Sequence, residues 1–458
     1  MNTRLRLSDA FHYLMNEAND RAYVLDRAGK RSASVLNGDA FELLVGSDTS
    51  WQDDPEFEQF LLGAKAAGWL TERVQATDPV LRRIRRRHHL KRLQYEVNLV
   101  CNLECAHCYC SSSPRASQGM PTEFVLDVVR QAAELGVVHF DVTGGEPLVR
   151  RDIMEILRAI SERGMIPGLY SNGTLVTPEK AEQIFAAGVR WAQVSLDART
   201  PALHDELRGK PGAFDRAVNG IRALKAAGVR VRVAVCLSTR NVHEVDEMVA
   251  FFRDDLDVEV GLDRVIPAGR GCSSERPLAI ASAKYYEIIR RLVRHGPVAG
   301  KACDAIGRED DASSVEPSCG VGSSYLFLKH DGRAALCPTM TEAESPDFVQ
   351  ADLQTMSLED AWERFPTFER YRGVQCENAT ACPSGKRCAG GCRSNAYLLH
   401  GRVDSPDELN CNIHKNEGPG YRAMLDEYEA LRAQGKMPAR RPQWDVPTAP
   451  RRSLRVVA

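Results

Sequence analysis

Between residues 93 and 295, short apolar segments typical of β-strands alternate with amphipathic segments typical of α-helices. Such alternation favours parallel strands joined by right-handed crossovers. The predicted strands are Leu93–Val97, Val138–Thr143, Pro167–Ser171, Arg190–Leu196, Val229–Leu237 and Val258–Ile266. The predicted helices lie near 122–135, 151–163, 178–187, 213–227, 242–253 and 282–294. Four of these helices are followed by a glycine, as helix ends commonly are: Gly136, Gly164, Gly188 and Gly228.

Six strand–helix units are too few to close an eight-stranded barrel. We therefore expect an α/β fold in which residues 93–298 form a partial (β/α)6 TIM-like barrel. A doubly wound open sheet is the alternative that the pattern leaves open. In both folds, sites form at the C-terminal ends of parallel strands, so the residues that follow the strands are the functional candidates.

Different units flank the predicted barrel. Residues 1–75 combine short strands and two helices in a small α/β unit, and residues 76–92 form a basic linker that we expect to be a solvated helical connector. In residues 299–416 the periodicity fades while Cys, Gly and Pro increase, which predicts an irregular domain stabilised by metal. Residues 417–458 are expected to form a charged helix and a disordered tail.

Composition narrows the function classes. The 60 basic and 62 acidic residues give a formal net charge of −2, which does not indicate a strongly basic nucleic-acid binder. No apolar run approaches the roughly 18 residues of a membrane helix, and the N-terminus lacks the apolar segment of a secretory signal. We therefore expect a cytoplasmic protein with no membrane or nucleic-acid partner. It nevertheless carries 14 cysteines, and clustered cysteines in the reducing cytosol are more often metal ligands than disulfides.

Three of these cysteines follow the first predicted barrel strand. Cys101, Cys105 and Cys108 have the spacing C-x3-C-x2-C, which suits thiolates that hold one face of a [4Fe–4S] cluster and leave the fourth iron open. The motif resembles the core signature of the radical SAM superfamily, with His107 in place of the usual aromatic residue. The alternative is a structural zinc site with His107 as the fourth ligand.

The resemblance continues after the second predicted strand. Thr143-Gly144-Gly145-Glu146-Pro147 resembles the GGEP motif of the superfamily. The resemblance implies that Gly144 and Gly145 allow the backbone to approach the ligand closely, and that Glu146 pairs with the methionyl ammonium of S-adenosylmethionine. An ordinary turn between a strand and a helix is the alternative.

Further polar residues resemble positions that bind the same cofactor. Ser171 and Asn172 follow the third predicted strand, while Ser195 and Asp197 lie at the end of the fourth. By resemblance they hold the ribose and methionyl groups, and Arg208 pairs with the methionyl carboxylate. Helix caps or turns are the alternative for the serines and Asp197, and a solvated surface position is the alternative for Arg208.

A second group of cysteines resembles the SPASM domain, a twin-cluster extension of radical SAM peptide-modifying enzymes. The spacing of five residues between Cys376 and Cys382 departs from the two residues of the family pattern. By resemblance, one auxiliary [4Fe–4S] cluster is held by Cys319, Cys337 and Cys392, with Cys303 or an open iron completing it. The other auxiliary cluster is held by Cys376, Cys382, Cys388 and Cys411. Structural zinc is the alternative, although this segment has no C-x2-C knuckle.

Two weaker resemblances concern the substrate. Residues 35–44 and 68–70 resemble a PqqD-type element, a winged-helix fold that binds a leader peptide as an added strand. A winged helix that only packs on the barrel, or that binds DNA, is the alternative. Arg270, in a Pro-x-Gly-Arg-Gly stretch, resembles a segment of peptide- and porphyrin-modifying relatives. We expect Arg270 or Arg264 to face the substrate or to form a loop salt bridge.

Taken together, the resemblance implies a radical SAM/SPASM oxidoreductase that modifies a ribosomally synthesised precursor peptide, giving a crosslink or another oxidative change. It implies three [4Fe–4S] clusters, S-adenosylmethionine, and an electron donor such as flavodoxin or ferredoxin. Tetrapyrrole or small-cofactor synthesis and sulfatase maturation are alternatives. Pro338 counts against the last, because maturases carry an Asp there. A zinc-stabilised DNA-binding protein is the alternative from another class.

Overall fold

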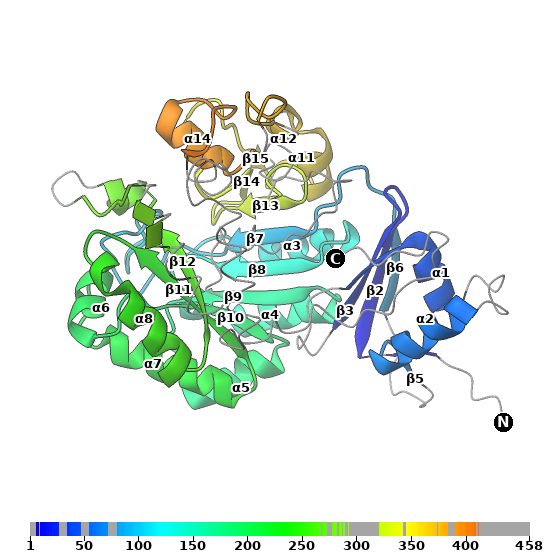
Figure 1. The fold of residues 1–458 in the computed structure, drawn as a ribbon, viewed down its shortest axis with the longest axis horizontal. Helices are drawn as coiled ribbons and strands as arrows, with labels where there is room; N and C mark the ends of the chain where they lie inside the picture. Colours follow the sequence, from blue (N-terminus) through cyan, green and yellow to red (C-terminus); the bar gives the residue numbers. More distant parts are fainter. Residues whose placement is uncertain are drawn as a thin grey trace.

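The computed structural model describes residues 6–8, 10–26, 34–46, 55–71, 80–266, 268–272, 277–281, 284–285, 287–288, 292, 320–341, 345–372, 374–382, 390–408 and 411. A central sheet with its helices lies between an N-terminal unit on one side and a C-terminal unit on another (Figure 1). The central sheet contains nine strands in the order β12-β11-β10-β9-β8-β7-β13-β14-β15.

Six strands of this sheet, β7 to β12, are parallel and lie in chain order. A doubly wound sheet reverses its strand order at a switch point, so the unbroken order corresponds to the predicted partial barrel. The predicted strands agree with the observed ones to within two residues at each end. They are β7 (Arg92–Glu96), β8 (His139–Thr143), β9 (Ile166–Ser171), β10 (Trp191–Ser195), β11 (Arg230–Leu237) and β12 (Glu259–Arg264).

Helices cover one face of these strands (Figure 1). Their apolar residues pack against strand residues such as Leu93 and Tyr95, which are fully buried. The glycines expected at the helix ends have positive φ angles, between 77° and 98°. The helices of this region are α3 (Thr122–Glu134), α4 (Ile153–Glu162), α5 (Pro178–Ala186), α6 (Pro201–Arg208), α7 (Ala213–Ala226) and α8 (Val245–Ala250), with shorter turns at Pro147–Val149, Val242–Glu244, Phe251–Asp255 and Gly269–Cys272. Most of the helix predicted near 282–294 lies outside the described residues.

The opposite face of the sheet carries polar side chains, because side chains alternate along each strand. Arg92 of β7 forms an ion pair with Asp141 of β8 and donates a hydrogen bond to the Tyr170 hydroxyl of β9 (2.8 Å). Asp141 is buried in this network, whereas the Arg92 side chain is 43% exposed. The C-terminal ends of the same strands carry the cysteine loop and the other predicted site residues.

The N-terminal unit is a small α+β domain. Its strands form a four-stranded sheet in the order β4-β3-β2-β6 and a separate pair, β1 with β5. Asn37 accepts a hydrogen bond from the Ala40 N–H and caps α1, as its position before the helix suggests. The elements are β1 (Arg6–Leu7), β2 (Phe11–Asn16), β3 (Arg21–Asp26), β4 (Ser34–Asn37), α1 (Gly38–Val45), α2 (Pro55–Ala66), β5 (Leu70–Thr71) and β6 (Val80–Ile84).

The expectation of a helical connector in the basic linker is wrong. Residues 80–84 form β6, which pairs in parallel with β2. The side chain of Ile84 packs with Leu14 and Val138, and Arg82 donates to the carbonyl oxygens of Ala133 (3.0 Å) and Arg163 at the ends of α3 and α4. The linker therefore joins the N-terminal sheet to the barrel, a role that an arginine-rich sequence does not reveal.

The C-terminal unit is more regular than its sequence predicts. Strand β13 pairs in parallel with β7, and Trp362 and Phe348 are buried in the same apolar core as the barrel. Trp362 Nε1 donates to the His88 carbonyl (2.6 Å), which fixes the unit against the linker. The sequence of this unit shows little helical or strand periodicity in its apolar residues, because its buried residues pack against the barrel. The elements are β13 (Tyr325–Leu328), β14 (Arg333–Ala335), β15 (Ala351–Asp352), α11 (Leu358–Arg364), α12 (Pro366–Tyr371) and α14 (Arg393–His400).

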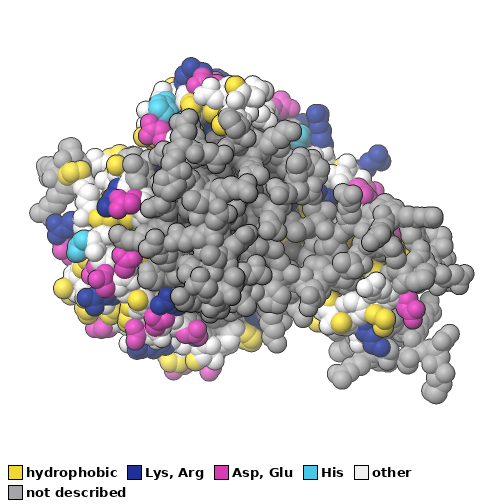
Figure 2. All heavy atoms as spheres, viewed as in Figure 1, with side chains coloured by type: hydrophobic (Ala, Val, Ile, Leu, Met, Phe, Trp, Pro, Cys, Tyr) yellow, Lys and Arg dark blue, Asp and Glu magenta, His cyan; other side chains and the backbone are white. Residues whose placement is uncertain are grey.

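Charges of both signs are interspersed on the described surface. Figure 2 shows Asp and Glu side chains mixed with Lys and Arg over the barrel helices on one face, in keeping with the formal net charge of −2. Within the described residues, no helix has both the length and the apolar character needed to cross a membrane.

Candidate radical site at the C-terminal ends of the strands

The three cysteines of the first motif lie together in the loop that follows β7. Cys101 and Cys105 are buried, Cys108 packs against them, and Leu103 and Ala213 complete the cluster. The loop is fixed at both ends by backbone hydrogen bonds. The N–H of Val97 donates to the carbonyl of Thr143 (2.9 Å), and the N–H of Ala106 donates to that of Leu207 (2.9 Å).

The contacts of the three sulfurs fit ligands of an iron–sulfur cluster, because each sulfur faces a nitrogen donor. Hydrogen bonds to thiolate sulfur stabilise the negative charge that a cluster places on its ligands. The donors are the N–H of Leu103 to Cys101 (3.4 Å), Arg208 Nη1 to Cys105 (3.7 Å) and the N–H of Ser112 to Cys108 (3.3 Å).

The protonation of these thiols differs with their surroundings. Burial raises the pKa of Cys101 to about 12 and raises the pKa of Cys105 as well. The pKa of Cys108 is lowered to about 5, chiefly by the hydrogen bond with the Cys110 thiol, whose sulfur lies 3.6 Å away. Cys101 and Cys105 are therefore protonated near neutral pH, and binding of a cluster must release their protons.

The GGEP-like turn packs directly on the cysteine loop. A Cβ atom on Gly145 would lie 2.5 Å from the carbonyl oxygen of Leu99, and one on Gly144 would lie 2.7 Å from that of Asn98. The Gly145 N–H also donates to the Asn98 carbonyl (2.8 Å). The close approach that requires glycine here is therefore an approach to the protein's own backbone.

Gly145→Ala is expected to disturb the cysteine loop, because backbone atoms rather than a flexible side chain occupy the space. Overpacking of this kind costs about 1–3 kcal/mol. We expect less iron per chain after anaerobic reconstitution, measured by iron analysis and absorbance. Gly46→Ala, at a helix end in the N-terminal unit, is the control and should retain the wild-type iron content. Equal iron content in both variants would contradict the expectation.

Glu146 is fully buried and connects the ends of two strands. Its Oε1 accepts hydrogen bonds from the Ser171 hydroxyl (2.9 Å) and the Leu148 N–H (3.1 Å), and its Oε2 accepts one from the Asn172 N–H (2.7 Å). The Asn172 side chain donates to Asn102 Oδ1 (2.9 Å), inside the cysteine motif. The structure thus brings three predicted site residues, Glu146, Ser171 and Asn172, into one network with the cysteine loop.

Asp197 forms a second buried network on the other side of the loop. Its Oδ2 lies 2.8 Å from Arg208 Nη2 and 3.3 Å from His107 Nε2, and its Oδ1 accepts the N–H of Cys236 (2.9 Å). Burial lowers the pKa of His107 to about 4, so this imidazole is neutral near pH 7. The predicted site residues Asp197 and Arg208 thus form an ion pair that the sequence did not predict. The surface alternative for Arg208 is wrong, because its side chain is only 9% exposed.

Arg208 and Ser195 are the remaining predicted site residues at this edge of the sheet. The buried Nε of Arg208 has no hydrogen-bond partner among the described residues. Ser195 ends β10 at the same edge of the sheet. Its side chain points away from the face of Ala192 and Val194, which pack on the helices.

Arg270 clamps the cysteine loop from the end of β12, a role that sequence reasoning missed. Its Nε donates to the Cys105 carbonyl (2.8 Å), its Nη2 to the Ser112 carbonyl (2.8 Å), and its own N–H to the Cys108 carbonyl (3.0 Å). Gly269 (φ 53°) allows this contact, since a Cβ there would lie 2.7 Å from the Cys108 carbonyl oxygen. Arg270 thus donates to backbone carbonyls rather than forming the loop salt bridge, and the expectation that Arg270 or Arg264 faces the substrate stays a prediction. A Gly-Arg-Gly sequence after a strand is the only signal that could have indicated the clamp.

Arg270→Gln is expected to weaken the retention of iron. Hydrogen bonds from a charged donor contribute about 1.5–3 kcal/mol each, and glutamine is too short and lacks the charge to replace both. We expect loss of the cluster absorbance in the presence of a chelator to be several-fold faster than in the wild type. Arg253→Gln, which removes an exposed arginine paired with Asp254, is the matched control. If the cluster absorbance of Arg270→Gln were lost at the same rate as that of Arg253→Gln, the proposed role of Arg270 in holding the cysteine loop would be contradicted.

Hydrogen bonds link the segments that carry described cysteines of the second group. The Thr339 and Ser394 hydroxyls are 2.6 Å apart and connect the turn after Cys337 to the start of α14 after Cys392. Asp407 accepts the N–H groups of Cys392 (2.8 Å, side chain) and Cys411 (2.8 Å, backbone). Cys376 and Cys382 flank one turn, in which the Ala379 N–H donates to the Cys376 carbonyl (2.8 Å). Cys303, Cys319 and Cys388 lie outside the described residues.

Comparison with known proteins gives the following matches. The family described as the radical SAM superfamily matches residues 95–252. An AdoMet-dependent heme synthase of Methanosarcina barkeri is 27% identical over 68% of this chain and 93% of that protein. Mycofactocin maturase MftC of Mycobacterium tuberculosis is 27% identical over 75% and 88%, and the PqqA peptide cyclase of Gluconobacter oxydans is 27% identical over 68% and 88%.

Solved structures share the fold. Streptococcus suis SuiB bound to S-adenosylmethionine has a TM-score of 0.65 at 14% identity, and the match covers 89% of this chain and 100% of that one. SuiB bound to the precursor peptide SuiA also has a TM-score of 0.65, at 13% identity, covering 90% and 100%. These shares are too large for the barrel and the C-terminal residues alone, so the match includes part of the N-terminal unit.

Proposed function

We propose that this chain is a radical SAM enzyme that modifies a ribosomally synthesised precursor peptide by abstracting a hydrogen atom through a 5′-deoxyadenosyl radical. The observation that carries the proposal is the enclosed cysteine loop at the C-terminal ends of the strands. Three sulfurs with nitrogen donors lie there between the Glu146 network and the Asp197–Arg208 pair.

The relatives support a peptide as the substrate. Two of the named relatives are a peptide cyclase and a maturase, and one solved structure of the same fold contains a precursor peptide. The N-terminal unit supplies a suitable docking element. Strand β4 lies at one end of its described sheet, while the other end, β6, is held to the barrel through Arg82. We assign the leader peptide to β4 as an added strand.

The cofactors implied by the superfamily are S-adenosylmethionine and one [4Fe–4S] cluster, and the cysteine loop fits them. We assign Cys101, Cys105 and Cys108 as the cluster ligands. Within the proposal, two auxiliary [4Fe–4S] clusters use the C-terminal cysteines, and a flavodoxin or ferredoxin supplies the electron. The proposed auxiliary ligands are Cys303, Cys319, Cys337, Cys376, Cys382, Cys388, Cys392 and Cys411.

When bound, the cluster and S-adenosylmethionine supply the radical, and the chain's own residues orient and enclose it. Arg208 would bind the methionyl carboxylate through its Nε, a buried N–H that has no partner among the described residues. Gly144 and Gly145 hold the backbone of the turn against the loop, and Glu146 holds Ser171 and Asn172 in place. Ser195 and Asp197 line the same edge of the sheet.

The test uses the full chain, purified without oxygen, reduced with dithionite and given S-adenosylmethionine. A precursor peptide encoded by a short open reading frame beside the gene is the probe. We expect 5′-deoxyadenosine and a peptide that has lost two hydrogen atoms, both measured by mass spectrometry. With three cubanes the protein contains about 12 iron atoms per chain. Colourless protein loaded with zinc, without 5′-deoxyadenosine, would refute the proposal.

A second candidate is tetrapyrrole synthesis, because an AdoMet-dependent heme synthase is among the relatives that align over most of their length. Modification of a precursor peptide would use the N-terminal unit to bind the leader, whereas a porphyrin-type substrate has no leader to bind. Decarboxylation of a porphyrin-type substrate, with no change in any peptide, would favour the second.

Recognition of a leader is expected to affect peptide binding more than chemistry. A peptide without its leader segment cannot pair with β4, so we expect its KM to rise at least about tenfold, equivalent to about 1.4 kcal/mol. Adding the free leader segment should not restore this KM, because the link between leader and modified residue is lost. Equal KM values with and without the leader, measured by mass spectrometry, would contradict strand addition.

A further inference from the structure

Three carboxylates are buried at the C-terminal ends of the barrel strands. Two of them already have hydrogen-bond or ion-pair partners on both oxygens. Glu146 accepts three hydrogen bonds that use both of its oxygens. Asp197 is neutralised by Arg208 and accepts a backbone N–H. The third is Glu96, the last residue of β7 and 3% exposed, which lies at the start of the cysteine loop.

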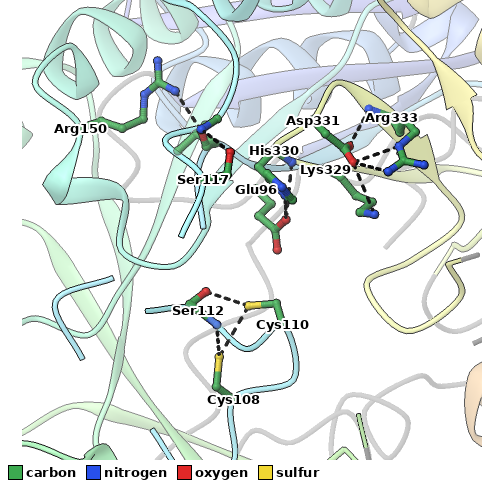
Figure 3. Close-up of polar contacts among 12 residues, drawn as sticks. Glu96, Cys108, Cys110, Ser112, Ser117, Arg150, Lys329, His330, Asp331 and Arg333 are labelled. Carbon is green, nitrogen blue, oxygen red and sulfur yellow. Dashed lines mark hydrogen bonds and ion pairs between the residues drawn. The ribbon is translucent and has the colours of Figure 1, made fainter. Parts of the chain in front are cut away.

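Glu96 differs from the other two in its partner. Its Oε1 lies 2.8 Å from His330 Nδ1 and 3.5 Å from the His330 backbone nitrogen, and no described residue hydrogen-bonds to Oε2. His330 lies in the turn between β13 and β14 of the C-terminal unit, and its side chain is 15% exposed. In Figure 3 the second oxygen of Glu96 points away from His330, toward the segment that contains Cys108, Cys110 and Ser112. A buried carboxylate thus has one free oxygen and a partner that can itself exchange a proton.

The cations beside His330 contact Asp331 rather than Glu96. Asp331 pairs with Arg333 (2.6 Å) and with Lys329 (3.7 Å) within the turn (Figure 3). Among the described residues, the contacts of Glu96 include no Lys or Arg side chain. A carboxylate within hydrogen-bond distance of an imidazole has the geometry of a general base and its positioning partner.

We propose that Glu96 and His330 form a proton-accepting pair for the substrate, with Glu96 Oε2 as the atom that takes the proton. The proposal rests on the proposed function. The pair joins the end of β7, which leads into the cysteine loop, to the turn between β13 and β14 of the C-terminal unit. His330 Nδ1 holds Oε1 and, by exchanging a proton with Glu96, returns the carboxylate to its charged form.

The balance of an oxidative crosslink requires such an acceptor. Joining a C–H carbon to an X–H group of the same peptide forms one C–X bond and removes two hydrogen atoms. One leaves as a hydrogen atom and converts the 5′-deoxyadenosyl radical into 5′-deoxyadenosine. The other leaves as a proton and an electron. The proton goes to Glu96 Oε2, and the electron goes to an oxidised iron–sulfur cluster.

The test measures how much crosslinked peptide forms per 5′-deoxyadenosine. The probe is the precursor peptide that the wild-type enzyme converts, and the variants are Glu96→Gln and His330→Gly. A positioned base contributes about 10²–10⁴-fold, so we expect this ratio to fall at least about a hundredfold in Glu96→Gln. In His330→Gly the ratio should fall and then recover when imidazole is added, a response that a purely structural role would not give.

Glu359→Gln is the matched control, because it removes an exposed carboxylate whose ion pair with Arg86 also joins the C-terminal unit to the rest of the chain. Its ratio should match the wild type. Suppose that the wild type converts the peptide. A wild-type ratio in Glu96→Gln, or a failure of imidazole to rescue His330→Gly, would then refute the proton-accepting pair and leave the proposed function standing. If the wild type forms no altered peptide, the proposed function fails first and the pair fails with it.

Discussion

Cys105→Ala is expected to abolish cleavage of S-adenosylmethionine completely. Cys105 is the central cysteine of the loop, and its sulfur is the one that faces the buried guanidinium of Arg208. A cluster left with two thiolates loses its attachment, so we expect about four fewer iron atoms per chain. The measurements are iron analysis and the yield of 5′-deoxyadenosine under dithionite. Within the proposed assignment, the absorbance of the auxiliary clusters should remain.

Cys272→Ala is the matched control for this variant. Cys272 is exposed and lies in the turn that contains Arg270, close in sequence to the clamp but outside the ligand set. It should retain the wild-type iron content and cleavage. Residual cleavage by the Cys105 variant would show that another side chain holds the cluster, and the neighbouring thiol of Cys110 would then be the first candidate.

Asp197→Asn is expected to cause the largest loss of stability. The substitution keeps the shape but leaves the Arg208 guanidinium buried without its counter-ion. Removing one partner of a buried ion pair costs about 3–5 kcal/mol. We expect the free energy of unfolding of the barrel, measured by urea denaturation and circular dichroism, to fall by this amount. Adding Arg208→Met should recover part of it by removing the unpaired charge.

The same pair predicts a pH dependence. Burial alone would raise the pKa of Asp197, but the charge of Arg208, aided by His107, lowers it below its ordinary value. A carboxyl group with a depressed folded-state pKa stabilises the fold above its unfolded pKa of about 3.9 and loses this contribution as pH falls through the folded value. The wild type should therefore lose stability in acid more steeply than Asp197→Asn. Parallel curves for the two proteins would contradict the ion pair.

The sequence predicted the barrel well because its signals are local. Each strand is a short apolar run, each helix has a stripe of apolar residues, and both repeat within a window of a few residues. The C-terminal strand ends then bring the loop of Cys101, the GGEP-like turn and Asp197 together by topology alone. For this reason the sequence alone was enough to predict which residues form the candidate site.

The parts that were missed depend on contacts between distant segments. Strand β6 resembles a solvated arginine run until its partner β2 and the carbonyls of α3 and α4 are known. His330 meets Glu96 across 234 residues, and Arg270 reaches the Cys105 carbonyl across 165. Local propensity contains no information on such pairings, and an arginine that binds carbonyl oxygens has no distinctive sequence pattern.

The pairing of β13 with β7 fuses the C-terminal unit to the barrel through four residue pairs, from Tyr325 with Arg92 to Leu328 with Tyr95. A hinge rotation between the two would have to break this ladder, so they are expected to move as one rigid block. Admission of a bulky reactant then depends on loops at the rim rather than on the opening of two lobes. Truncation before residue 320 would also expose β7 as a bare sheet edge, a known route to aggregation.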